Sequence, residues 1–161
     1  MTERIEEELR NWFGDSKKTV VAGIGNIIRT DDNVGLRIVE LLEGKLSKQV
    51  LLLEAETVPE SYIIDIEEFA PSHVLLIDAA FLGLKPGEAS LVDAEKIENY
   101  SAITTHMLPL KVFCEYIKQV TGTKIALLLV QPRSTEFGEG LTPAVEKAAR
   151  RLAKVLLKVF G

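Results

Sequence analysis

The amino-acid sequence predicts an α/β fold, a three-layer α/β/α sandwich with a mostly parallel sheet of about five strands flanked by helices. Two observations favour this architecture. Short apolar runs alternate along the chain with longer segments in which apolar residues recur at helical spacing. One run, Val74-Leu75-Leu76-Ile77, is apolar at every position, as expected of a parallel strand that helices cover on both faces. The 161 residues fit one hydrophobic core, so we expect a single domain over residues 1–161.

The first half of the chain is expected to contain helices and strands in alternation. Gly14 and Asp15 end the first helix, and Gly44 lies near the end of the second. The predicted elements are a helix with Ile5, Leu9, Trp12 and Phe13 on one face, a strand over residues 19–24, a helix with Val34, Ile38, Leu41 and Leu42 on one face, a strand over 50–53, a short helix over 61–69 and a strand over 74–77.

The second half continues this alternation after a turn at residues 84–87. Thr142 has the residue type of an N-cap, and Pro143 suits the first position of the helix that follows. The predicted elements are a short strand over residues 89–92, a helix over 109–120, a strand over 124–130, and a last helix with Val145, Ala149, Leu152, Leu156 and Val159 on one face.

Composition excludes several classes of function. The formal net charge of −5 argues against a large nucleic-acid interface, which needs a basic face. No apolar run reaches the roughly 18 residues that span a bilayer, and the start Met1-Thr2-Glu3-Arg4 is not followed by the apolar region of a signal peptide. The single cysteine, Cys114, excludes an internal disulfide and a multi-cysteine zinc site. We therefore expect a cytoplasmic protein without membrane insertion.

Chemistry in such folds is expected outside the carboxyl ends of the strands. Gly23-Ile24-Gly25 ends the first strand there, but it does not match a dinucleotide-binding motif because Ile28 occupies the place of the third glycine. A tight turn that needs glycine is the simpler interpretation. There is no G-x-S-x-G or H-E-x-x-H motif, and Cys114 lies among apolar helical residues, which indicates packing.

Polar side chains near the ends of the predicted strands are candidates for a site at this edge. Asp31 and Asp32 precede the second helix, where one of them could cap the helix and the other could face a ligand. Asp78 follows a buried strand, at an edge where we expect its carboxylate to remain partly solvated. His106 lies in the connection that leads into the helix over 109–120. Two carboxylates and one imidazole suit a first-row divalent metal or the activation of water. His73 precedes its strand, so it is expected at the opposite edge.

Four blocks of sequence together resemble the hydrogenase maturation proteases, and more closely the branch that serves hydrogenase-3-type enzymes. The resemblance covers roughly residues 20–157, and the blocks follow one another in the order found in the family. They are Gly23-Ile24-Gly25-Asn26-Ile27-Ile28-Arg29-Thr30-Asp31-Asp32-Asn33-Val34-Gly35, the segment 74–79, Thr104-Thr105-His106-Met107-Leu108-Pro109-Leu110, and Val130-Gln131-Pro132.

The resemblance implies a five-stranded α/β/α sandwich and an endopeptidase of the aspartic type. It also implies that Asp32, Asp78 and His106 contact nickel and carry the catalytic function. The implied partner is the precursor of the large subunit of a [NiFe]-hydrogenase, from which a C-terminal extension is removed after nickel insertion. The substrate supplies the nickel, and no tightly bound cofactor is expected. Whether a carboxylate or the metal activates the attacking water stays open.

This sequence departs from the family pattern at two places. Glu54-Ala55-Glu56-Thr57 stands where family members commonly carry a glycine-containing run after the second strand, and Glu56 replaces a glycine. Asn33 also stands where glycine is frequent. Two other functions remain as alternatives: a free-standing metal-dependent hydrolase, and a non-catalytic protein that binds nickel or a hydrogenase subunit. We expect a monomer or a weak oligomer.

Overall fold

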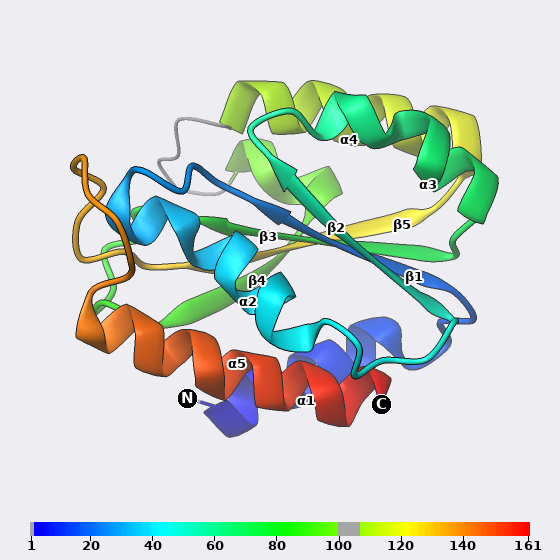
Figure 1. Ribbon diagram of the computed structural model, residues 1–161. Helices are drawn as coiled ribbons and strands as arrows, with labels where there is room; N and C mark the ends of the chain where they lie inside the picture. Colours follow the sequence, from blue (N-terminus) through cyan, green and yellow to red (C-terminus); the bar gives the residue numbers. More distant parts are fainter. Residues whose placement is uncertain (1, 100–106) are drawn as a thin grey trace.

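The computed structural model describes residues 2–99 and 107–161 (Figure 1). Within these residues, five strands form one sheet in the order β2-β1-β3-β5-β4. Strands β2, β1, β3 and β5 are parallel, and β4 pairs antiparallel with β5. The strands are β1 (Thr19–Ile24), β2 (Val50–Glu56), β3 (His73–Ala79), β4 (Ala89–Asp93) and β5 (Lys124–Val130).

Helices cover both faces of the sheet, which confirms the predicted three-layer sandwich. Figure 1 shows α1, α2 and α5 against one face and α3 and α4 against the other. The α-helices are α1 (Thr2–Phe13), α2 (Val34–Leu42), α3 (Ile63–Phe69), α4 (Met107–Thr121) and α5 (Pro143–Phe160). The short 3₁₀ helices are η1 (Thr30–Asn33), η2 (Pro59–Tyr62) and η3 (Ala94–Asn99).

Alternation along the central strands divides the core into two layers, because successive side chains of a strand point to opposite faces. Val21 and Leu75 pack with the helices α1, α2 and α5, whereas Val20 and Leu76 pack with α3 and α4. Every residue of β1 and of β3 is buried. The uniformly apolar run over residues 74–77 was therefore correctly interpreted as a strand covered on both faces.

Strand β2 is longer than predicted. The prediction ended it at residue 53, but the strand continues to Glu56. Glu54 and Glu56 are exposed and Ala55 between them is buried, as alternation along an edge strand requires. Glu56 also adopts a positive φ of 52°, a conformation that glycine adopts more readily than other residues.

Other boundaries moved by a few residues. The first turn of the helix predicted over 61–69 is a 3₁₀ helix that begins at Pro59, and α4 begins at Met107 rather than Pro109. Helix α5 begins at Pro143 with Thr142 as its N-cap, as predicted. None of the helices in the described residues is long and apolar enough to cross a membrane.

Candidate active site

Glycines bring α2 against the carboxyl ends of β1 and β3. A Cβ atom on Gly35 would lie 2.2 Å from the carbonyl oxygen of Ile77 and 2.7 Å from that of Ile24. A Cβ atom on Gly23 would lie 2.5 Å from the carbonyl oxygen of Gly35. Only hydrogen fits at these contacts, so the backbone of the first turn of α2 rests directly on the two strands. The segment before α2, which carries Asp32, is thereby held at the carboxyl end of β3, the strand that carries Asp78.

Asp32 lies in η1, close to the turn that follows β1. The residue is 6% exposed, and its Oδ2 accepts a hydrogen bond from the backbone N–H of Asn26 at 2.9 Å. Gly25 has a φ of 151°, and a Cβ atom there would lie 2.0 Å from the backbone oxygen of Asp32. The glycine pair therefore forms a tight turn, as predicted. In this turn Gly25 lies close to the backbone of Asp32, and the turn orients the Asp32 carboxylate.

Asp31 has a different role. It is completely buried, and its carboxylate accepts hydrogen bonds from the backbone N–H groups of Arg133, at 2.9 Å, and Ser134, at 3.2 Å. The backbone N–H and the hydroxyl of Thr142 also donate to it, both at 2.7 Å. Asp31 thus fixes the loop between β5 and α5.

The predicted capping of α2 by one of the two acids was wrong. Within the described residues, the N-cap of α2 is Asn33, which makes no side-chain capping hydrogen bond. The acid that is not directed to the site, Asp31, instead bonds to the distant loop between β5 and α5. One acid of the pair is structural, as expected. However, Asp31 bonds to residues that are distant in the sequence and not to the first turn of the adjacent helix.

Asp78 lies inside β3 rather than after it. It pairs in register with Leu129 of β5, and its side chain is completely buried. Its Oδ1 accepts a hydrogen bond from the backbone N–H of Ala79 at 2.8 Å. We expected a partly solvated carboxylate at an exposed edge, and this was wrong because the first turn of α2 and η1 cover the end of β3.

Strands β1 and β3 are hydrogen-bonded neighbours in the sheet, since Gly23 of β1 pairs with Ile77 of β3. The structure therefore brings Asp32 and Asp78 to the carboxyl edge of two adjacent strands. His106 lies outside the described residues. Within the described part of the chain, no three His, Cys, Asp or Glu side chains are arranged to hold a metal ion. The set of Asp32, Asp78 and His106 therefore stays a prediction.

The two other candidates that were set aside lie where the sequence placed them. His73 begins β3 at the opposite edge of the sheet, with its Nδ1 2.9 Å from Ser72 Oγ and its Nε2 3.2 Å from Asp15 Oδ1. Burial lowers the pKa of His73. Cys114 is buried on α4, and burial raises the pKa of its thiol to about 12. A thiol with this pKa is protonated at neutral pH and is a poor nucleophile.

Gln131 is a positioning residue that the sequence analysis did not single out. It follows β5 and is 7% exposed. Its Oε1 accepts hydrogen bonds from the backbone N–H groups of Leu82, at 2.6 Å, and Leu84, at 3.3 Å, and its Nε2 donates to the backbone oxygen of Pro132 at 3.0 Å. Gln131 therefore ties the loop after β3 to the end of β5. Its presence in the Gln-Pro block was the available signal.

Large apolar side chains are exposed in loops that follow the carboxyl ends of the strands. The loop after β1 also pairs with the loop before α5 through a bridge between Arg29 and Gly138, and the Arg29 guanidinium lies 5.9 Å from the centre of the Phe137 ring. Clustered exposed apolar side chains are typical of surfaces that bind other macromolecules. The exposed residues are Ile27, Ile28, Val58, Phe81, Leu84 and Phe137.

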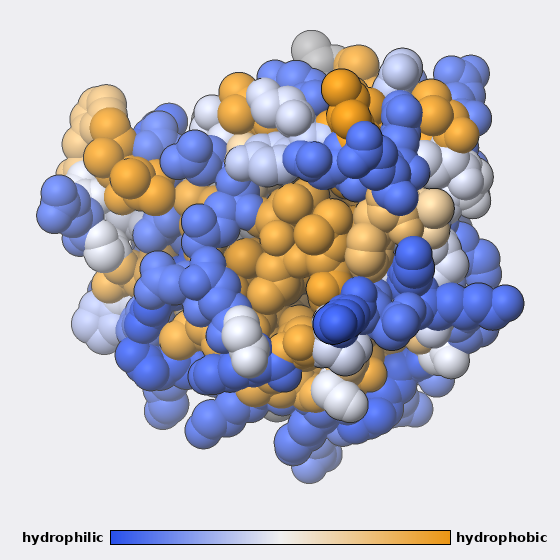
Figure 2. All heavy atoms as spheres, turned by 45° about the vertical axis from the view of Figure 1, so that its right-hand side comes forward, coloured by the Kyte–Doolittle hydropathy of each residue, from blue (hydrophilic) through white to orange (hydrophobic). Residues whose placement is uncertain are grey.

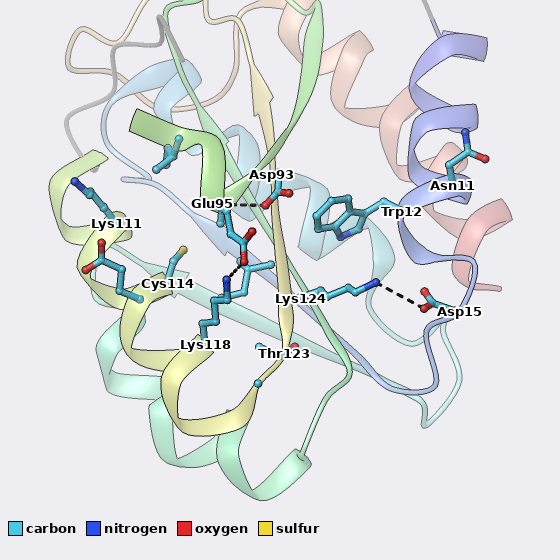
Figure 3. A pocket seen from close by; sticks show the side chains of 15 residues that line it. Asn11, Trp12, Asp15, Asp93, Glu95, Lys111, Cys114, Lys118, Thr123 and Lys124 are labelled. Atoms are coloured by element: carbon cyan, nitrogen blue, oxygen red, sulfur yellow. Dashed lines mark hydrogen bonds and ion pairs between the residues drawn. The ribbon is translucent and has the colours of Figure 1, made fainter. Parts of the chain in front are cut away.

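A large cavity lies away from this edge. It has a volume of about 880 Å³ and is lined by residues around the amino end of β5, among them Trp12, Cys114 and Lys124. Figure 3 shows Lys118 of α4 directed toward Glu95, and Lys124 directed toward Asp15, with which they form ion pairs. Neither Asp32 nor Asp78 lines this cavity, so it is separate from the candidate site.

Comparisons with known proteins identify the family of this chain. Residues 36–159 match the family model for the hydrogenase maturation protease HycI. A Methanocaldococcus jannaschii protein assigned to the hydrogenase maturation proteases is 30% identical over 168 aligned positions, which cover 99% of this chain and 96% of that protein. The hydrogenase 3 maturation protease of Escherichia coli is 28% identical over 80% of this chain and 82% of its own length.

Solved structures show the same relationship. The crystal structure of a [NiFe] hydrogenase maturation protease, HycI, from Thermococcus kodakarensis superposes with a TM-score of 0.87 at 33% identity. The match covers 95% of this chain and 98% of that one. The family model, these relatives and the shared fold show that this chain belongs to the hydrogenase maturation protease family and is a peptidase.

Proposed function

We propose that this protein is an endopeptidase that removes the C-terminal extension of a [NiFe]-hydrogenase large-subunit precursor after nickel insertion. Asp32, Asp78 and His106 bind the nickel that the substrate carries. The observation that supports this proposal most directly is the glycine-mediated contact of α2 with β1 and β3, which holds Asp32 and Asp78 at one edge. The protein is proposed to act as one domain over residues 1–161.

The ligand set explains why the nickel belongs to the substrate. Two carboxylates and one imidazole leave the coordination of a first-row metal incomplete. The chain has one cysteine, and Cys114 is buried on α4 with a raised pKa, so it is not a thiolate ligand. Thiolates of the precursor complete the coordination in this proposal. The enzyme would then distinguish a precursor that contains nickel from one that does not.

Buried carboxylates suit this task. A backbone N–H holds one oxygen of Asp32 and one oxygen of Asp78, and each of these hydrogen bonds restricts the orientation of the carboxylate. Hydrolysis adds a water oxygen to the carbonyl carbon of the scissile peptide bond and delivers a proton to the leaving amine. A carboxylate that accepts the proton of the water and passes it to the amine supplies general acid–base catalysis.

The surroundings of the site favour a protein substrate over a small molecule. Ile28 and Phe137 are 49% and 82% exposed, and both lie in loops at the same edge as Asp32. A folded partner that covers these side chains would remove apolar surface from water. We also propose that the protein acts in the cytoplasm, as its single cysteine suggests, and as a monomer or weak oligomer.

The proposal is tested by the intact mass of a purified large-subunit precursor before and after incubation with the protein. We expect a loss of mass equal to one C-terminal peptide, and no loss with Asp32→Asn or Asp78→Asn. Binding of the precursor without a change in mass would support a non-catalytic binding protein. A protein that purifies with bound metal and hydrolyses small esters or amides would instead be a free-standing metal-dependent hydrolase.

A further inference from the structure

Strand β2 forms an open edge of the sheet. Within the described residues, β1 is the only strand that pairs with β2. Three successive apolar residues of β2, Val50, Leu51 and Leu52, are only partly buried. Figure 2 shows this face of the molecule, where apolar side chains gather in a hollow with polar side chains around it. An open apolar edge strand can bind another extended segment through backbone hydrogen bonds.

The backbone of β2 shows which groups face this edge. The carbonyl oxygen of Gln49 accepts a hydrogen bond from the N–H of Thr19, at 2.9 Å, on the β1 side. Backbone groups of successive residues alternate in direction along a parallel strand, so those of Val50, Leu52 and Glu54 face outward. The hydroxyl of Tyr62 donates to the outward carbonyl of Glu54 at 3.0 Å, which agrees with this alternation. The outward N–H of Val50 donates to the carbonyl oxygen of Ser47 at 3.1 Å, so the outward groups of Leu52, between these two hydrogen bonds, form the centre of the open edge.

A groove of about 430 Å³ lies along the carboxyl half of β2; we call it the β2 groove. Its walls combine apolar and acidic side chains. Desolvation and the neighbouring Glu43 raise the pKa of the Glu54 carboxyl, and Glu40 and Glu56 add to this effect. The carboxylates therefore repel one another, and a cationic partner would relieve the repulsion. The groove is lined by Val39, Glu43, Leu52, Leu53, Glu54, Glu56 and Tyr62.

The β2 groove ends beside the candidate site. The carbonyl oxygen of Glu56 accepts a hydrogen bond from the N–H of Gly25 at 2.8 Å. Gly25 also lies in close contact with the backbone of Asp32, as described above. A polypeptide bound along the groove would therefore reach the end of β2, and only β1 would separate it from the loop that carries Asp32.

We propose that the β2 groove binds an extended, basic segment of the substrate polypeptide as an added strand and directs the adjoining residues to the candidate site. This inference rests on the proposed function. The open Leu52 backbone supplies the pairing, and the apolar walls receive alternate side chains. The acidic walls select lysine or arginine at the other positions. A second copy of this chain is a poorer occupant, because it would bury Glu43, Glu54 and Glu56 of both copies together.

Peptide binding to the full-length protein tests this directly. The probe is a twelve-residue peptide of alternating valine and lysine, measured by isothermal titration calorimetry and by amide shifts of β2 in NMR spectra. We expect it to bind at β2 and the Glu43→Lys/Glu54→Lys double variant to bind it roughly tenfold more weakly, since each reversal replaces a screened attraction by a repulsion. Glu3→Lys/Glu7→Lys on α1, with the same change in net charge, should bind as the wild type does.

A second peptide separates strand pairing from charge attraction. It keeps the lysines but has proline at every valine position, so it lacks alternate N–H groups and should not bind at β2. Equal binding of both peptides, or of the wild type and the Glu43→Lys/Glu54→Lys variant, would overturn the proposal. So would a dimer at micromolar concentration that Leu52→Pro dissociates, because the second copy would then occupy the edge.

Processing assays distinguish this inference from the proposed function. Asp78→Asn should bind the valine–lysine peptide normally and fail to process the precursor. The Glu43→Lys/Glu54→Lys variant should process it with a raised KM and a nearly unchanged kcat, because the groove binds the substrate and does not touch the scissile bond. A lowered kcat at unchanged KM would contradict a docking role for the groove, whereas normal processing by Asp78→Asn would contradict the proposed active site alone.

Discussion

The carboxylates of Asp31 and Asp32 are adjacent in the chain but bond to different parts of the molecule. Asp31 accepts four hydrogen bonds from Arg133, Ser134 and Thr142, more than one hundred positions away. The Oδ2 of Asp32 accepts a hydrogen bond from the N–H of Asn26, in the turn beside it. The first acid therefore joins the loop before α5 to the loop after β1, and the second is oriented by the turn that forms the candidate site.

Substitution of each acid by asparagine should separate stability from activity. Asp31→Asn places an amide where four donors converge, so we expect a loss of stability on the order of 3 kcal/mol. Asp32→Asn keeps an oxygen that can accept the Asn26 hydrogen bond, so its stability should change by less than about 1 kcal/mol while processing is lost. Urea denaturation and precursor processing measure the two effects. An Asp32→Asn enzyme that processes normally would remove Asp32 from the site.

Gly35 allows a second test of how α2 positions the site. Alanine favours a helix over glycine by about 1 kcal/mol, but a Cβ atom at this position would meet the carbonyl oxygens of Ile77 and Ile24. We expect the steric conflict to dominate, with Gly35→Ala losing on the order of 2 kcal/mol and most of its activity as Asp32 moves. Gly138→Ala is the control, since the nearest atom to its Cβ would be Thr30 Oγ1 at 3.4 Å.

The sequence was sufficient for the fold because its signals are local. Apolar runs and helical periodicity identified the elements, and the parallel direction of most strands followed from their alternation with helices. The candidate residues Asp32 and Asp78 could be placed at one edge for the same reason, since each lies at the carboxyl end of its strand or in the turn that follows.

Features that depend on distant contacts were not predictable. The burial of Asp78 depends on the packing of α2 against β3, and the role of Asp31 depends on a loop that begins about one hundred residues later. The extension of β2 was missed because Glu54 and Glu56 interrupt the apolar run, although an edge strand tolerates exposed charges. Only the three-dimensional arrangement shows which charges face solvent.

The ion pair between Arg37 of α2 and Glu146 of α5 predicts a pH dependence of stability. Arg37 Nε lies 3.0 Å from Glu146 Oε1, and this hydrogen bond lowers the pKa of the Glu146 carboxyl. Because the pKa of Glu146 is lower in the folded state, its carboxylate stabilises the fold at pH values above its unfolded-state pKa of about 4.3. This stabilisation is lost as the pH falls through the folded-state pKa. We expect Glu146→Gln to cost about 1 kcal/mol at pH 7 and progressively less below pH 4.3.

Denaturation curves of the two proteins between pH 7 and pH 2.5 measure this difference. Glu8→Gln is the control, because Glu8 pairs with Arg4, whose side chain is 80% exposed, and screened surface pairs contribute little. A constant difference between the wild type and Glu146→Gln at all pH values would show that the ionised pair is not responsible.

Cys114 should be dispensable for catalysis. The thiol is buried against the apolar layer on α4, and burial raises its pKa to about 12. Cys114→Ala should process the precursor at the wild-type rate and lose on the order of 1 kcal/mol of stability through lost packing. Modification of the folded protein by iodoacetamide at pH 8 should be slow for the same reason. Complete loss of processing in a folded Cys114→Ala protein would instead indicate thiol chemistry.

Dependence on the substrate's nickel is the most discriminating prediction. Asp32, Asp78 and His106 supply two carboxylates and one imidazole, and thiolates from the precursor complete the coordination in the proposed complex. Loss of contacts worth about 4 kcal/mol would lower transition-state binding roughly a thousandfold, so the nickel-free precursor should not be processed on the assay timescale. Intact-mass time courses of matched precursors with and without nickel, using one enzyme preparation, measure the ratio of the two rates.

The same experiment needs a control for the condition of the precursor. Reconstitution of the nickel-free precursor should restore processing by the wild type and by His73→Gln, whose substituted residue lies at the opposite edge of the sheet. It should not restore processing by Asp78→Asn. Equal rates on both precursors would contradict recognition through nickel and would indicate a protease that reads the peptide alone. The β2 groove would then carry most of the specificity, and the Glu43→Lys/Glu54→Lys variant should discriminate poorly between precursors and unrelated peptides.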